Sequence, residues 1–98
     1  MVSKKNLSAN RETALAVYPN PVSNTAEVTF NLSQEGIAKI KLVDISGRSV
    51  IEKDLGLLYE GENRYTLDNL SQLESGAYII LLDVNGKTVS NKRISLVK

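Results

Sequence analysis

The side chains that most often carry out chemistry in proteins are scarce in this sequence. It contains no cysteine and no histidine, which excludes thiol chemistry, disulfides and histidine as a general base or metal ligand. Paired carboxylates exist, for example Glu60 and Glu62, but they fall in an expected loop among other charges. The motifs of calcium-binding loops and of glycine-rich phosphate-binding loops are absent. We therefore expect no enzyme activity, no cofactor and no metal site.

Basic side chains dominate the last part of the chain. No acidic residue follows Asp83, whereas Lys87, Lys92, Arg93 and Lys98 are all basic. A polarised surface of this kind can orient a partner and speed its encounter. Lysines on an edge strand can equally protect a sheet against aggregation, and the charge alone leaves both explanations open. Because the formal net charge is only +1, we expect no nucleic-acid partner.

Length and composition indicate one small globular domain. The chain has 98 residues, of which 42% are hydrophobic, and no stretch is apolar for the roughly 18 residues that a transmembrane helix needs. Residues 1–14 are polar and lack the apolar segment of a signal peptide, so we interpret them as a linker or a remnant of recombinant expression. Either the protein is cytoplasmic, or the sequence is part of a longer exported chain whose signal lies elsewhere.

Alternating apolar and polar residues predict β-strands along most of the chain. In residues 25–32, for example, Ala26, Val28, Phe30 and Leu32 share one face. The segment at 15–21 contains two prolines, which suits an edge strand because proline lacks the N–H donor. Further strands are expected at residues 37–45, 49–58 and 63–67, followed by a terminal pair after Gly76.

Turn signals separate these strands. Asn85-Gly86 predicts a type I′ hairpin turn, which needs positive φ at both positions. Gly47 is expected to supply the left-handed residue of a second hairpin, held by the side chain of Asp44. Residues 22–24 are interpreted as a turn. The only helix-like place is 68–75, where a short 3₁₀ turn is expected to bury Leu70 and Leu73.

These elements define the expected fold class. About seven short strands, with no helix long enough to connect parallel strands, predict an all-β, seven-stranded antiparallel immunoglobulin-like β-sandwich. Cysteine and tryptophan are both absent, so the term describes the architecture and not the core of an antibody domain. No internal repeat is present.

Four motifs, in order, resemble those of a known family. The chain resembles the C-terminal sorting domain of the type IX secretion system (type A, Por secretion system) of Bacteroidota over residues 15–98. The motifs are Tyr18-Pro19-Asn20-Pro21 before a strand with Phe30, the LVDISGRSV stretch from Leu42, the LESGAYII stretch from Leu73, and Asn85-Gly86 continuing to Lys92-Arg93-Ile94.

The resemblance implies more than the residue patterns do. Such domains lie at the C-termini of exported cargo proteins, which cross the inner membrane and periplasm and then pass the outer membrane to the cell surface or medium. The partners would be the type IX translocon, shuttle and sortase proteins, and the N-terminal cargo domain is absent from this chain. A surface sortase would cut at about residues 5–16. The implied signal positions, several of which could serve folding instead, are Pro19, Asn20, Pro21, Asp44, Gly47, Gly76, Tyr78, Gly86 and Lys92.

Two alternatives share this architecture. A carbohydrate-binding or adhesive module of a surface protein would need clustered exposed aromatic side chains, and the chain offers only Tyr18, Tyr59, Tyr65 and Tyr78 besides one phenylalanine. A spacer domain would need no partner. The sorting hypothesis instead expects the terminal hairpin to dock through an exposed strand edge and its basic side chains.

Overall fold

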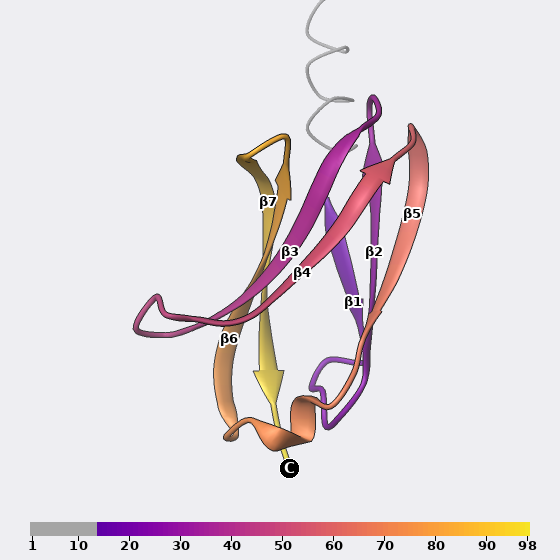
Figure 1. Cartoon of the computed structure of the whole chain (residues 1–98). Helices are drawn as coiled ribbons and strands as arrows, with labels where there is room; N and C mark the ends of the chain where they lie inside the picture. The colour runs from indigo at the N-terminus through magenta and orange to yellow at the C-terminus, as the bar shows by residue number, and fades with distance from the viewer. Residues whose placement is uncertain (1–13) are drawn as a thin grey trace, which may run out of the picture.

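The computed structural model describes residues 14–98 and confirms the seven-stranded antiparallel sandwich (Figure 1). One sheet has three strands in the order β1-β2-β5, and the other has four in the order β4-β3-β6-β7. All but the last residue of the expected linker at 1–14, and most of the expected cleavage region, lie outside the described residues. The elements are β1 (Leu15–Tyr18), β2 (Ala26–Leu32), β3 (Gly36–Asp44), β4 (Ser49–Leu58), β5 (Gly61–Leu67), the 3₁₀ helix η1 (Leu70–Gln72), β6 (Gly76–Val84) and β7 (Lys87–Leu96).

The core lies between the two sheets and follows the period of two. The expected inward face of β2 is buried from Ala26 to Leu32. The second sheet contributes alternate residues of its two central strands, which are Ala38, Ile40 and Leu42 of β3 and Ile80 and Leu82 of β6. Successive side chains of a strand point to opposite faces, so the sequence pattern was sufficient to identify the buried residues of β2 and β3.

The 3₁₀ helix is present, but it buries one leucine where two were expected. Leu70 is fully buried, whereas Leu73 is only partly buried. Leu73 follows the helix in an extended conformation and lines an open groove. The turn therefore plugs the end of the core with a single side chain.

The interpretation of residues 22–24 as a plain turn was incomplete. Val22 is fully buried and forms an isolated parallel bridge with Leu96 of β7. The chain thus pairs first with β2 through β1 and then with β7 through Val22, which connects the edges of the two sheets. β5 also begins earlier than expected, at Gly61, because β2 continues to pair as far as Leu32 opposite Gly61.

The terminal hairpin forms as predicted and lies at the edge of the larger sheet. β6 pairs with both β3 and β7, while β7 pairs only with β6 apart from the bridge to Val22. β7 contributes Ile94 and Leu96 to the core. The described part of the chain contains no helix of the length and hydrophobicity needed to cross a membrane.

Candidate recognition site

Most of the expected signal positions gather around one end of the sandwich, which we call the motif end. Asp44 of β3 is paired with Tyr78 of β6, and Gly76 of β6 is paired with Leu96 of β7. The bridge from Val22 to Leu96 brings the preceding prolines and Asn20 to the same end. Gly86 lies at the opposite end, in the β6–β7 turn, and Lys92 lies between the two ends on β7.

Residues 19–24, which we call the clasp, tie β7 to the rest of the motif end. The N–H of Val22 donates to the Ser95 carbonyl at 2.8 Å, and the N–H of Val97 donates to the Val22 carbonyl at 2.8 Å. The Asn20 side-chain oxygen accepts from the Ser95 N–H at 3.2 Å. The clasp therefore supplies hydrogen-bond partners for the outward backbone groups of Ser95, near the C-terminal end of β7, which an edge strand otherwise leaves unpaired.

The same segment also holds the 3₁₀ helix. The N–H of Leu70 donates to the Asn24 carbonyl at 2.9 Å, and the N–H of Ser71 donates to the Asn24 side-chain oxygen at 3.0 Å. The first N–H groups of a helix have no acceptor within the helix itself. Asn24 supplies the acceptors for two of them, the N–H groups of Leu70 and Ser71. The Y-P-N-P motif and the residues after it thus organise contacts between segments far apart in the sequence.

Tyr78 and Gly76 stand at the start of β6. The Tyr78 side chain is buried, and its hydroxyl donates to the Glu74 carbonyl at 2.6 Å. A buried tyrosine at the start of this strand, bonded to backbone a few residues upstream, is the tyrosine corner of immunoglobulin-like sandwiches. This contact supports a role for Tyr78 in folding, while its expected role in recognition remains a prediction.

Asp44 and Gly47 form the β3–β4 turn as the sequence predicted. The Gly47 N–H donates to the Asp44 carbonyl at 2.9 Å, and Gly47 has a φ of 91°. The Asp44 carboxylate accepts from the Ser46 hydroxyl at 2.7 Å and from the N–H groups of Ser46 and Arg48 at 3.0 Å each. The hydroxyl of Ser46 first, and then the N–H of Arg48, lower the pKa of Asp44 below its usual 3.8.

Gly86 lies in a type I′-like turn that is fastened to the start of β3. Asn85 and Gly86 have φ values of 54° and 82°, as predicted. The Asn85 N–H donates to the Ile37 carbonyl at 2.7 Å, and the Asn85 side-chain oxygen accepts from the Ile37 N–H at 2.9 Å. This approach requires Gly36, because a Cβ there would lie 2.6 Å from Cγ1 of Val84.

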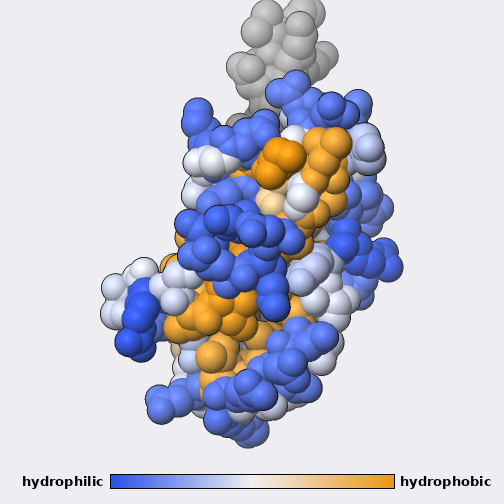
Figure 2. Space-filling model, viewed as in Figure 1, coloured by the Kyte–Doolittle hydropathy of each residue, from blue (hydrophilic) through white to orange (hydrophobic). Residues whose placement is uncertain are grey.

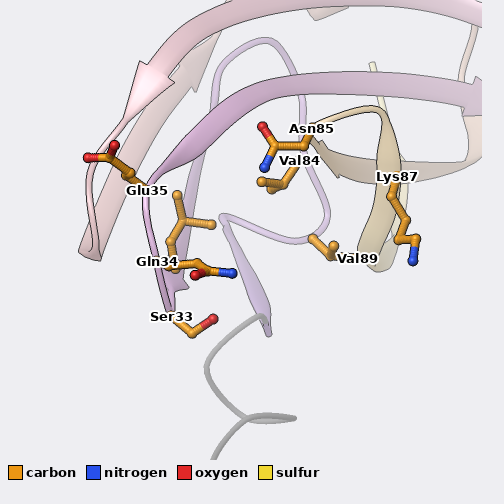
Figure 3. A pocket seen from close by; sticks show the side chains of 8 residues that line it. Ser33, Gln34, Glu35, Val84, Asn85, Lys87 and Val89 are labelled. Carbon is orange, nitrogen blue, oxygen red and sulfur yellow. The ribbon is translucent and has the colours of Figure 1, made fainter.

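A groove of 320 Å³ opens beside the β6–β7 turn, at the end of the molecule opposite the motif end. Side chains of the β2–β3 loop line one side of it, and side chains of β6 and β7 line the other (Figure 3). Glu35 and Lys87 are its only charged lining residues. This lining offers no cluster of titratable groups, so we assign no chemistry to it.

The basic side chains of β7, and Lys98 after it, are exposed and make no ion pair within residues 14–98. Lys87, Lys92, Arg93 and Lys98 are all exposed, and the ion pairs of this part of the chain involve other cations. The last acidic residue, Asp83, is instead engaged elsewhere on the sheet. Its carboxylate lies 3.5 Å from the Lys41 amine and accepts from the Thr88 hydroxyl at 2.6 Å.

The outer faces of the two sheets differ in character. On the four-stranded sheet, Ile37 and Leu57 are paired neighbours that are 57% and 47% exposed. On the three-stranded sheet, the outward Glu27 and Arg64 form an ion pair at 3.0 Å. Figure 2 shows hydrophobic surface in separate areas of the viewed face, with hydrophilic side chains between them. The apolar Ile37–Leu57 pair and the basic β7 edge thus both belong to the four-stranded sheet.

The tyrosines that an adhesive module would use are dispersed. Tyr18 is exposed at the end of β1, and Tyr59 is exposed after β4 at the opposite end of the sandwich. Tyr65 is partly buried and Tyr78 is buried. In the described part of the chain they build no aromatic platform of the kind that stacks on sugars.

The strand order, the tyrosine corner and the bridge through Val22 define a small immunoglobulin-like β-sandwich domain. Residues 16–97 match the family model described as the secretion system C-terminal sorting domain. The chain belongs to this family, the sorting domains of type IX secretion. Family membership implies export to the cell surface or the extracellular space by the type IX machinery.

Solved structures share the fold at low sequence identity. Dimeric latent PorU from Porphyromonas gingivalis matches with a TM-score of 0.63 and 16% identity, over 85% of this chain and 9% of that chain. A β-glucosidase, EmGH1, from Erythrobacter marinus matches with a TM-score of 0.59 and 16% identity, over 86% of this chain and 15% of that one. An immunoglobulin-like protein from Pseudomonas aeruginosa matches with a TM-score of 0.54 and 7% identity, over 87% of this chain and 78% of that one. The search of curated proteins gives no match.

Proposed function

We propose that this domain is a non-catalytic address that carries an attached cargo protein through the periplasm and across the outer membrane by type IX secretion. The observation that carries the proposal is the family match over residues 16–97, to which the likeness of PorU adds support at the level of the fold. The cargo would precede the domain in the full-length protein. The translocon and a shuttle would read the folded domain, and a surface sortase would then remove it.

The terminal hairpin is the surface we propose for docking. β7 stands at a sheet edge, where backbone groups can pair with another strand without a preformed pocket. Its exposed cations add a long-range attraction that steers an acidic partner. By contrast, the polar side-chain groups of Asn20, Asp44 and Tyr78 at the motif end form hydrogen bonds within the domain.

The pairing of β1 supports a shorter cleavage region than the one expected from the sequence. The expected interval of about residues 5–16 overlaps β1, in which Leu15 and Val17 are buried and each residue is paired with β2. A protease must hold its substrate in an extended, accessible form, and a strand fixed in a sheet is not available for this. We therefore propose that the cleaved bond lies before Leu15, since Ala14 is exposed.

Export of a reporter tests the proposal. The whole 98-residue chain is fused behind a periplasmic reporter in a bacterium with a working type IX system, and the reporter is measured at the cell surface and in the medium. A strain that lacks the translocon serves as the control. Translocon-dependent export is expected, whereas reporter retained equally in both strains would overturn the sorting function.

A deletion from Asn85 onward is an unsuitable test of the docking surface. Such a deletion removes Ile94 and Leu96, which are 1% and 2% exposed in the core, so it would unfold the domain as well. The charge-reversed pair Lys92→Glu and Arg93→Glu keeps the core intact. Its matched control is Lys53→Glu, an exposed cation on β4. Normal export by the β7 variant would exclude the β7 cations from docking.

A further inference from the structure

Part of the β7 edge has no backbone partner within residues 14–98. The N–H and carbonyl of Ser95 both bond to the clasp, so they point away from β6. Backbone direction alternates along an antiparallel strand, which places the N–H and carbonyl groups of Asn91 and Arg93 on the same outer edge. Within the described chain, no backbone bond outside the β6 ladder reaches either residue.

The free stretch has defined limits. At one end, the register shift between Leu82 and Asp83 interrupts the β6–β7 ladder near Val89. At the other end, the clasp covers Ser95 and Val97. The regular free edge is therefore residues 90–93. At about 3.3 Å per residue it accepts a strand of about four residues, with hydrogen-bonded pairs at Asn91 and Arg93.

Charge and side-chain direction define what that strand must carry. Lys92 and Arg93 are consecutive, so they point to opposite faces of the sheet. Both are exposed, and neither makes an ion pair in the described chain. A strand that satisfies both needs acidic side chains at two consecutive positions, because opposite charges directly across a strand pair are favourable.

We propose that residues 90–93 of β7 receive an extended segment of a partner protein that carries two consecutive acidic residues, added as a fifth strand to the four-stranded sheet. This inference rests on the proposed function, because it specifies the partner of the docking edge. A second copy of this chain does not fit the site. Two β7 edges brought together would place Lys92 and Arg93 of both copies side by side, and like charges across strands are destabilising.

The other edge of the four-stranded sheet, β4, is less suited to such a strand. β4 pairs with β3 through two register shifts, near Lys39 and Val43, and bulges twist an edge away from regular pairing. Its exposed charges also alternate in sign, from Glu52 through Lys53 to Asp54. Of the two edges of this sheet in residues 14–98, β7 is the one whose regular stretch carries charges of a single sign.

Peptide binding tests the site directly on the full 98-residue chain. The probe is a hexapeptide of sequence Thr-Val-Asp-Glu-Val-Thr, and its matched control has two lysines at the acidic positions. Amide hydrogen exchange is followed by NMR up to about 1 mM peptide, a range that detects affinities of the order expected for one short strand. We expect exchange of the Asn91 and Arg93 amides to slow by about tenfold or more with the acidic peptide only, because free amides exchange fast and paired ones slowly.

A charge swap provides the decisive comparison. The variant with Lys92→Glu and Arg93→Glu should bind the acidic peptide at least about tenfold more weakly and should gain binding of the lysine peptide. The Lys53→Glu variant should behave as the unaltered chain does. Absence of protection at 1 mM, equal binding of both peptides, or protection at β4 or β5 would each overturn the proposal. Export of the reporter is measured separately, so a domain that exports its cargo but binds no acidic strand would refute this inference and leave the sorting function standing.

Discussion

The hydroxyl of Tyr78 donates a hydrogen bond of 2.6 Å to the backbone carbonyl of Glu74, four residues earlier. The bond ties the start of β6 to the segment that follows η1, and the ring is buried in the core. From the sequence, Tyr78 was a candidate for recognition by the secretion machinery. Its buried position offers a partner little surface, which favours a role in folding.

Tyr78→Phe should lower the free energy of unfolding by about 1–2 kcal/mol, because it leaves the Glu74 carbonyl without its donor while the ring stays packed. Tyr78→Ala should cost about 3–5 kcal/mol through the cavity it leaves. Urea denaturation followed by circular dichroism measures both. Under conditions where the phenylalanine variant remains folded, reporter export should be unchanged. A folded variant that fails to be exported would restore the recognition role.

Sequence patterns predicted the strands well because alternation, prolines and turn residues act locally. The faces of β2 and β3 follow from period two, and the turns at Gly47 and Gly86 follow from residues that tolerate positive φ. The fold class was predicted, whereas the order of strands within the sheets came only from the structure. The basic character of β7 was also visible in the sequence, before its position at an edge was known.

The features that the sequence did not reveal depend on contacts between distant segments. Val22 reads as part of a polar turn, yet its burial comes from pairing with Leu96 at the other end of the chain. Gly36 looks like an ordinary strand breaker, and only the approach of Val84 shows why a side chain is excluded there. Such positions carry no local pattern, so periodicity cannot identify them.

Two glycines should respond differently to substitution by alanine. Gly86→Ala forces a side chain into a φ of 82° and should cost about 1–2 kcal/mol. Gly36→Ala places a Cβ 2.6 Å from Cγ1 of Val84 and should cost about 1–3 kcal/mol through overpacking. Gly86→Asn is the informative control. Asparagine tolerates the left-handed region, so this variant should lose less free energy of unfolding than Gly86→Ala. Equal losses for alanine and asparagine at position 86, measured by urea denaturation, would contradict the conformational explanation.

Acid should weaken the β3–β4 turn only at a pH below the usual pKa of an aspartate, because Asp44 takes up its proton at a lower pH than usual. The pKa of Asp44 is lower in the folded protein than its usual 3.8, first because of the Ser46 hydroxyl. Its contribution to stability is therefore present above the unfolded pKa and is lost as the pH falls through the folded value. Carboxyl shifts of Asp44 and amide shifts of Ser46 and Arg48, recorded by NMR, should titrate together below pH 3.8. In Asp44→Asn this shared transition should vanish, and its persistence would assign it to another group.

The clasp offers the clearest separation of folding from recognition. Asn20 accepts from the Ser95 N–H although the two residues are 75 positions apart. Asn20→Ala should therefore speed amide exchange at Ser95 and lower the free energy of unfolding by about 0.5–1.5 kcal/mol. Asn31→Ala is the matched control, since Asn31 is exposed on β2 and its side chain makes no hydrogen bond within residues 14–98.

Export by the same Asn20 variant decides what the Y-P-N-P motif contributes. If Asn20 acts only through the Ser95 contact, export should fall no further than in a core variant of equal stability, such as Ile94→Val. Both substitutions would then reduce export only by lowering the fraction of folded molecules. If the secretion machinery reads the Asn20 side chain itself, export should fall well below that of the stability-matched variant while the fold persists. The comparison works because Asn20 is exposed and Ile94 is buried, so the two substitutions share an effect on folding and differ in the surface that a partner meets.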